Sequence, residues 1–449
     1  MYPFDPAFTG DLQHFKDLLY DPRMKEGMTK NYLIRMVDFD GLTALHYAAM
    51  GGRTEICKFL VEEVKLNVDL KDLRNGRTPL HHAVLTERIP TAAYLLENGA
   101  NPNAGTKYKG RTALHYAADK GPKELIELLL SKGADIDAMA DCGTPLQYAA
   151  TRRKKDSVKV LLDNHAGPNV VSHNLSSPLL ASIHGLSVEY APSFECIKLL
   201  LKAGADPNFR GLRGTPLGFA ASEGETEVIL YLLNAGANPN IIDNLGMKPV
   251  EVAALRGNRK GVMTLFPVTS PIPTISDWSV DGLLEYVHSD EAIKERKEKK
   301  KEQFLFSKSK GAEAFNIKDY FGAMQWYTEA INFEPTDASV WSNRSLCWAH
   351  MDDGDSALLD AEECIKLKPN WPKGYYRAGA AEMLLEGFVS AADTFYRGWK
   401  LNRKNKELER AFRYQSPKEE AAFDPRYLKL HNSCSWLIGT DSTTLYAIC

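Results

Sequence analysis

The sequence predicts an all-α repeat protein built from two kinds of helical repeat, and two observations support this fold class. A short motif rich in alanine and histidine returns at intervals of 32 to 38 residues through residues 38–267. A second pattern of small and aromatic residues returns every 34 residues from residue 304, with a closing proline in its first two copies and Arg403 in the third. Periods of this length are typical of solenoids in which each repeat is one helix pair.

The first motif reads Gly-x-Thr-x-Leu-His-x-Ala-Ala in its clearest copies. Its threonine is predicted to cap a short helix, and a proline directly after it suits the first turn, where a missing N–H costs nothing. The alanines allow a second helix to approach closely, and a Gly-Ala-Asn/Asp segment ends that helix. The threonine position is occupied in order by Thr43, Thr78, Thr112, Thr144, Ser177, Thr215 and Lys248.

This motif resembles the ankyrin repeat family over residues 38–267, with a degenerate copy in residues 1–37 as an N-terminal cap. The resemblance implies an ankyrin solenoid of helix pairs with finger loops, whose concave face binds a protein partner in most members. The longest interval predicts a bulge within residues 184–192. The last copy has Lys248 and Glu251 in place of threonine and histidine, which suits a polar end cap.

Four histidines recur in this half and raise the question of a metal site: His46, His81, His82 and His115. Successive imidazoles lie about one repeat apart instead of converging, and no cysteine stands beside them at ligand spacing. Their position in the ankyrin pattern implies instead that each ring bonds the backbone across repeats. We therefore expect neither a metal nor another cofactor.

Residues 268–303 are predicted to form a linker, because three prolines interrupt any helix at its start. A short amphipathic helix follows, with Val280, Leu283, Leu284 and Val287 on one face. We expect it to pack on the last ankyrin unit; the alternative is a separate partner-binding motif. The charged segment 291–302 is expected to be a solvated helix, although its lysines could also aid nuclear import.

The second pattern has units beginning at residues 304, 338 and 372. Small residues at helix crossings, large residues between helices and proline at the exit resemble the 34-residue tetratricopeptide (TPR) repeat. Residues 304–414 are therefore expected to form a three-unit TPR superhelix with a capping helix. Residues 415–449 form a tail in which we recognise no motif.

Polar residues at the starts of these units form the candidate site. Lys373 and Arg377 are four apart and share a helix face, while Lys308 and Asn343 lie in the equivalent first helices. These residues resemble the carboxylate clamp of chaperone-adaptor TPR domains, which grip the C-terminal Glu-Glu-Val-Asp of the 70-kDa and 90-kDa heat-shock chaperones. That clamp is Lys, Asn, Asn, Lys and Arg, and its remaining asparagine falls on Ala312. Losing one neutral donor costs about 1 kcal/mol, or roughly five- to tenfold in affinity.

The order of the two repeat types resembles a small plant family of ankyrin–TPR proteins. It implies a non-enzymatic protein–protein interaction adaptor of co-chaperone type, in which the ankyrin face holds a partner or client. The alternative is a general scaffold whose two surfaces bind internal protein segments without recognising chaperone tails, so that the clamp residues are merely solvated. An enzyme is not expected, because the chain lacks a phosphate-binding glycine loop, a nucleophile elbow and metal-ligand spacing.

Composition sets further expectations. A formal net charge of −3 argues against nucleic-acid binding. The seven cysteines are scattered and are expected to be reduced thiols. The first residues contain neither a basic nor an apolar segment, and no apolar run is long enough to span a membrane. We therefore expect a cytoplasmic protein, a nuclear protein or both.

Overall fold

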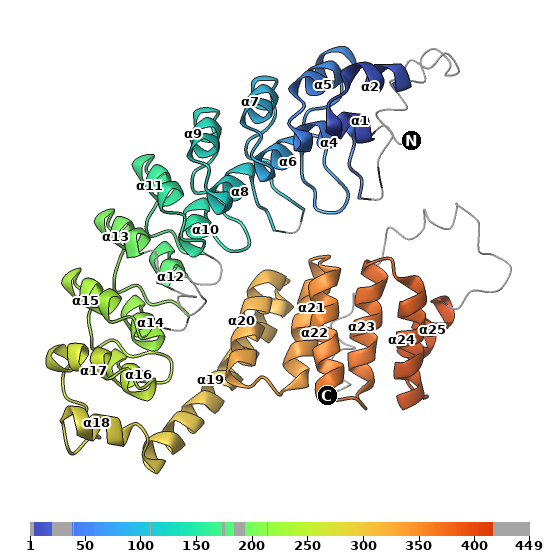
Figure 1. Ribbon diagram of the computed structural model, residues 1–449. Coiled ribbons are helices and arrows are strands. Elements are labelled where there is room, and N and C mark those ends of the chain that lie inside the picture. Colours follow the sequence, from blue (N-terminus) through green and yellow to red (C-terminus); the bar gives the residue numbers. More distant parts are fainter. Residues whose placement is uncertain are drawn as a thin grey trace. The chain divides into compact units, whose positions relative to one another are not determined.

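The computed structural model describes residues 4–19, 38, 40–107, 109–172, 176–183, 194–212 and 214–415, and Figure 1 shows their arrangement. Within these ranges the chain is helical and has no β-strand, only isolated bridges between Ala140 and Gly143 and between Gly211 and Gly214. Contacts divide the chain into two compact units, Met1–Ser289 and Asp290–Cys449. The predicted all-α repeat fold is confirmed.

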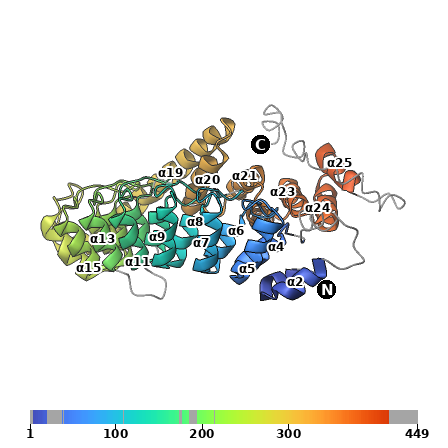
Figure 2. The same ribbon diagram turned by 90° about the horizontal axis from the view of Figure 1, so that it is seen from above.

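The first unit is a stack of helix pairs that lie side by side in chain order (Figures 1 and 2). Two helices come first, α1 (Phe4–Thr9) and α2 (Leu12–Leu19). The first helices of the pairs are α4 (Ala44–Gly51), α6 (Pro79–Leu85), α8 (Ala113–Lys120), α10 (Pro145–Thr151), α12 (Pro178–Ile183), α14 (Pro216–Glu223) and α16 (Pro249–Leu255). The second helices are α5 (Thr54–Lys58) with the π-helical turn η1 (Phe59–Glu63), α7 (Ile89–Glu97), α9 (Lys123–Ser131), α11 (Lys155–Asp163), α13 (Phe194–Lys202), α15 (Thr226–Asn234), and α17 (Arg259–Leu265) with the 3-10 turn η2 (Phe266–Val268).

The caps and the core explain why these segments fold as predicted. Thr78 is the N-cap of α6, and Pro79 is the first residue of that helix. The same threonine–proline pair begins α10 and α14. Buried leucines, isoleucines and alanines form one hydrophobic core that runs through the whole first unit. Because each pair leaves an apolar face uncovered, this core is completed by neighbouring repeats.

The ends of the first unit agree with the sequence where the structure describes them. α1 packs on α4, as a degenerate N-terminal cap should, whereas residues 20–37 lie outside the described ranges. The predicted bulge at residues 184–192 also lies outside them. After α17, Ser279 caps α18 (Val280–Tyr286). Leu283 of this helix and Val287, directly after it, are buried in the core of the first unit. α18 contacts α16, so its predicted packing on the last ankyrin repeat is confirmed.

The second unit consists of helical hairpins followed by one more helix (Figure 1). α19 (Asp290–Asn316) pairs with α20 (Tyr320–Phe333), α21 (Ala338–His350) with α22 (Gly354–Leu367), and α23 (Pro372–Leu384) with α24 (Phe388–Leu401). α25 (Lys406–Gln415) packs on α24. Glycines mark the hairpin crossings: a Cβ atom on Gly311 would lie 2.7 Å from the ring of Tyr327, and one on Gly379 would lie 2.6 Å from the ring of Phe395. The predicted tail lies outside the described residues from 416 onward.

The boundary predicted at residue 304 lies inside α19. The charged segment assigned to the linker and the first TPR helix form one helix of 27 residues. Its N-terminal part carries an ion pair between Lys299 and Glu295 at 2.7 Å, one turn apart. Such pairs support a solvated helix that has no apolar stripe.

Two compositional expectations concern residues that the structure describes. Cys57, Cys196, Cys347 and Cys364 are buried free thiols, Cys142 is an exposed one, and the other two cysteines lie outside the described ranges. Among the described helices, none combines the length and the apolar character that crossing a bilayer requires.

Candidate functional site

The four predicted clamp residues lie on the first helices of the three hairpins. Lys308 is on α19, Asn343 on α21, and both Lys373 and Arg377 on α23. α21 and α23 are in contact, and hydrogen bonds from Lys308 reach the start of α21. The fold therefore places Lys308, Asn343, Lys373 and Arg377 on neighbouring helices, and we use the name hairpin groove for this set of four residues.

Arg377 is the most unusual residue in the hairpin groove. It is half-buried, and its Nε atom is enclosed without a hydrogen-bond partner among the described residues. No carboxylate of the described chain forms an ion pair with it, although its electrostatic neighbours include Tyr376, the thiol of Cys347 and the carboxylate of Glu407. Burial lowers the pKa of the guanidinium. A buried cation normally has a counter-charge, because removing it from water alone costs several kcal/mol.

The charge of Arg377 also affects the imidazole of His350, which lies on the neighbouring helix α21. Its pKa is lowered to about 4, first by burial and then by Arg377. The ring stacks on Tyr320 with centroids 4.2 Å apart. His350 is therefore neutral near pH 7 and adds no second positive charge beside Arg377.

Lys308, in contrast, is already paired within the chain. Its Nζ donates to Asp337 Oδ2 at 2.9 Å and to Ser339 Oγ at 2.8 Å. The ammonium also lies 5.4 Å from the ring of Phe304. The sequence reading missed Asp337 and Ser339, although an Asp-x-Ser at the start of a predicted helix is a recognisable capping signal.

Asn343 is held by a residue that the sequence reading also missed. Its side chain forms a hydrogen bond with the hydroxyl of buried Tyr327. The Tyr327 ring packs on Gly311, where any larger residue would clash. A glycine on α19, a tyrosine on α20 and the clamp asparagine on α21 therefore form one connected set.

The two remaining predicted clamp positions differ in exposure. Lys373 is half-buried, with its Nζ 5.7 Å from the ring of Trp371. Ala312, at the position of the missing asparagine, is exposed. An amide at that position would therefore meet solvent and not the protein core.

An ion pair next to Asn343 fixes α21 in place. Arg344 donates to both carboxylate oxygens of Asp360 at 2.8 and 2.7 Å, and to Thr328 Oγ1 at 3.0 Å. Arg344 and Asp360 are both mostly buried. Burial raises the pKa of Asp360, and the Arg344 contacts oppose that rise. This network joins α20, α21 and α22 behind the hairpin groove.

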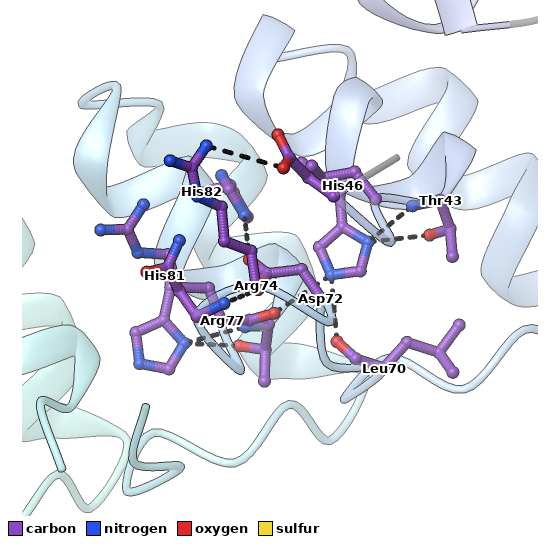
Figure 3. A network of polar contacts seen from close by, with 12 residues as sticks. Thr43, His46, Leu70, Asp72, Arg74, Arg77, His81 and His82 are labelled. Carbon is purple, nitrogen blue, oxygen red and sulfur yellow. Dashed lines mark hydrogen bonds and ion pairs between the residues drawn. The ribbon is translucent and has the colours of Figure 1, made fainter. Parts of the chain in front are cut away.

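In the ankyrin unit, three of the four recurrent histidines act as the sequence predicted. Nδ1 of His46, His81 and His115 accepts the backbone N–H of the capping threonine at 3.0 to 3.1 Å. Nε2 then donates to a carbonyl of the next repeat at 3.1 to 3.2 Å. Figure 3 shows His46 between its contacts with Thr43 and Leu70. Both ring nitrogens are used, which leaves no lone pair for a metal. Burial lowers the pKa of all three rings to about 4.

For His82 the prediction was wrong. Its Nε2 lies 3.2 Å from Asp72 Oδ2 in its own repeat, and its ring meets that of His46 edge-on at 5.4 Å (Figure 3). Burial would raise the pKa of Asp72, but hydrogen bonds from His82 and the Asn75 backbone hold it below its usual value. His82 follows the helix-start histidine by one residue, so it faces a different neighbour.

The tie between repeats changes along the stack. In the fourth motif Gln147 replaces histidine: its Oε1 accepts the Thr144 N–H at 2.8 Å, and its Nε2 donates to Ser176 O at 2.6 Å. The next two motifs have Leu180 and Gly218 at this position. The leucine side chain is apolar and glycine has none, so neither residue offers a side-chain hydrogen bond. Side-chain amides in the loops continue to link those repeats, through Asn169 Nδ2 to Gly204 O and Asn208 Nδ2 to Gly236 O.

Comparisons with known proteins find relatives of two kinds. The chain is 35% identical over 125 residues to the Hsp70-Hsp90 organizing protein of Triticum aestivum, which is 26% of this chain and 22% of that one. It is 40% identical over 101 residues to the heat shock protein sti1 homolog of Schizosaccharomyces pombe, 22% of this chain and 17% of that one. The chain thus spans about a fifth of the length of these relatives.

The crystal structure of the ankyrin repeat domain of Bcl-3 is similar to 50% of this chain and 99% of its own, with 26% identity and a TM-score of 0.44. The family model for ankyrin repeats (3 copies) matches residues 7–106, 103–174 and 185–271. Because these segments span more than half of the sequence, the chain belongs to the ankyrin repeat family.

Proposed function

We propose that this chain is a non-enzymatic co-chaperone-like adaptor whose hairpin groove binds acidic C-terminal peptides of heat-shock chaperones. The coarser part of this proposal, a protein-interaction adaptor, rests on the ankyrin repeats and on homology to organizing proteins. The names of those relatives suggest the chaperone class, and the clamp residues suggest which part of a chaperone is recognised.

One observation carries the peptide-binding proposal: in the described chain the guanidinium of Arg377 forms no ion pair with a carboxylate, and its Nε has no hydrogen-bond partner. Lys373 lies one turn earlier on the same helix, and Asn343 lies on the adjacent helix. A peptide carboxylate at Arg377 would supply the missing counter-charge through charge-assisted hydrogen bonds. Such bonds contribute roughly 1.5–3 kcal/mol each.

The test is a titration of a labelled peptide ending in Glu-Glu-Val-Asp onto the full chain, read by fluorescence anisotropy. Arg377→Ala should weaken binding about 10- to 150-fold, the equivalent of the lost charge-assisted contacts. Arg410→Ala removes an exposed arginine from α25 and should leave the affinity unchanged. Absence of binding to the native chain, or equal binding by Arg377→Ala, would contradict the proposal.

A general scaffold for internal segments is the second candidate, and two observations favour it. Lys308 is already engaged by Asp337, and Ala312 offers no amide. Amidating the C-terminus of the peptide separates the two candidates. A carboxylate clamp should lose most of its affinity, whereas a groove for internal segments should bind both peptides alike.

The ankyrin unit is proposed to bind a second protein through its finger loops. Leu73, Met139 and Ile242 are exposed apolar side chains, each in a loop that leads into the first helix of a repeat. Replacing all three by serine should abolish capture of a partner that Arg377→Ala still captures. Retention of that partner by the triple variant would contradict this assignment.

A further inference from the structure

Asp337 forms an ion pair with Lys308, the first lysine of the predicted clamp. One of its oxygens, Oδ2, accepts the Lys308 ammonium at 2.9 Å. The other, Oδ1, accepts the Ser339 backbone N–H at 2.8 Å and the Ser339 hydroxyl at 2.5 Å. The Ser339 hydroxyl oxygen in turn accepts from Lys308 at 2.8 Å. Lysine has three N–H donors, so two of the three on Lys308 are already used.

The position of Asp337 is fixed by the fold. It is the N-cap of α21, and its bond to the Ser339 N–H satisfies one of the unpaired donors at the helix start. The positive end of the helix dipole further favours the carboxylate there. Asp337 is therefore unable to swing away without giving up the cap.

Asp337 also stays charged. Burial would raise its pKa, but hydrogen bonds from Ser339 and Lys308 outweigh burial and lower it. At neutral pH a peptide carboxylate that approaches Lys308 meets a fixed negative charge beside the ammonium. Arg377 has no ion pair in the described chain; the carboxylate of Glu407 acts on it only electrostatically, without such a contact.

We propose that Asp337 is a specificity-determining residue that neutralises Lys308 and makes the hairpin groove depend on its Arg377 end for carboxylate recognition. The inference rests on the proposed function, because it concerns the same peptide site. It predicts a groove with unequal ends. A peptide carboxylate can form an ion pair with Arg377, whereas at Lys308 it must share the ammonium with Asp337.

The test uses Asp337→Asn, which keeps the size and the capping oxygen and removes the charge. The full chain is titrated with a labelled peptide ending in Glu-Glu-Val-Asp. Asp337→Asn should lower Kd about three- to tenfold, the size expected for relief of one like-charge contact near the surface. Asp353→Asn is the matched control: Asp353 caps α22 in the same way, and its replacement should leave Kd unchanged.

Lys308→Ala in both backgrounds completes the cycle and separates coupling from a general change in stability. It should weaken binding less than twofold in the native chain and about three- to tenfold in the Asp337→Asn chain. Thermal unfolding of each variant shows that it is folded. Equal Kd values for the native and Asp337→Asn chains would overturn the inference and leave the proposed function standing. Absence of binding to both would overturn the proposed function, and the inference with it.

Discussion

In the ankyrin unit, three of the recurring histidines and the loop asparagines bond to the next repeat, whereas Arg377 in the second unit has no ion-pair partner in the described chain. Repeat architecture explains the histidines and asparagines that link repeats, because their donors and acceptors recur together. It does not explain Arg377. A polar residue whose partner fails to recur with it is therefore the better candidate for ligand binding.

The largest effect should come from breaking the network that fixes α21. Arg344→Ala leaves Asp360 as an uncompensated buried carboxylate and should cost about 3 to 5 kcal/mol in the free energy of unfolding of the second unit. Chemical denaturation followed by the tryptophan fluorescence of that unit measures the loss. Removing both partners, as in Arg344→Met with Asp360→Leu, should recover much of it. A single variant as stable as the native chain would show that the pair does not hold α21.

An intermediate effect tests the histidine ties. The folded pKa of His115 is about 4, below its ordinary value of 6.5, so its stabilising contribution is complete above pH 6.5 and is lost as the pH falls toward 4. His115→Gln should keep both hydrogen bonds, as Gln147 does in the next repeat, without titrating. The variant should match the native chain at pH 7.5 within about 1 kcal/mol and exceed it by about 2 kcal/mol at pH 5.

Denaturation curves at the two pH values measure this difference. Ala118→Ser, a change on the same helix that introduces no titrating group, serves as the control for pH dependence. The same pH dependence in the native and His115→Gln chains would mean that His115 is not the titrating group.

The smallest effect concerns the hairpin groove. Ala312 is exposed, so Ala312→Asn restores the missing amide without a clash. It should tighten binding of the Glu-Glu-Val-Asp peptide roughly five- to tenfold, which corresponds to about 1 kcal/mol. Ala312→Ser, which offers a shorter donor, should gain less. Unchanged affinity in both variants would place the peptide away from α19.

The repeats and their caps could be predicted because their signals are local. Thr78 and Pro79, for example, specify a helix start wherever they stand. The positions of Lys308 and Arg377 could be predicted for the same reason, since register within a repeat fixes the helix on which each lies. The partners of these residues were harder to find. Asp337 meets Lys308 only because the hairpins stack across 29 residues of sequence.

The continuous helix α19 was missed for a different reason. Its first part has no apolar stripe, so hydrophobic periodicity gives no signal there. Ion pairs one turn apart, such as Lys299 with Glu295, support it instead. His82 was assigned incorrectly because its neighbour His81 follows the repeat rule, and adjacent residues on a helix face different surroundings.

The change from histidine and glutamine to leucine and glycine along the ankyrin stack has a mechanical consequence. Fluctuations that separate neighbouring repeats must break a side-chain hydrogen bond at each of the junctions that follow the first four motifs. At the repeats that begin with Ser177 and Thr215, the corresponding helix start offers only its own cap, through Leu180 N to Ser177 Oγ and Gly218 N to Thr215 Oγ1. We therefore expect the solenoid to be stiffer in its N-terminal repeats and more flexible around α12 and α14.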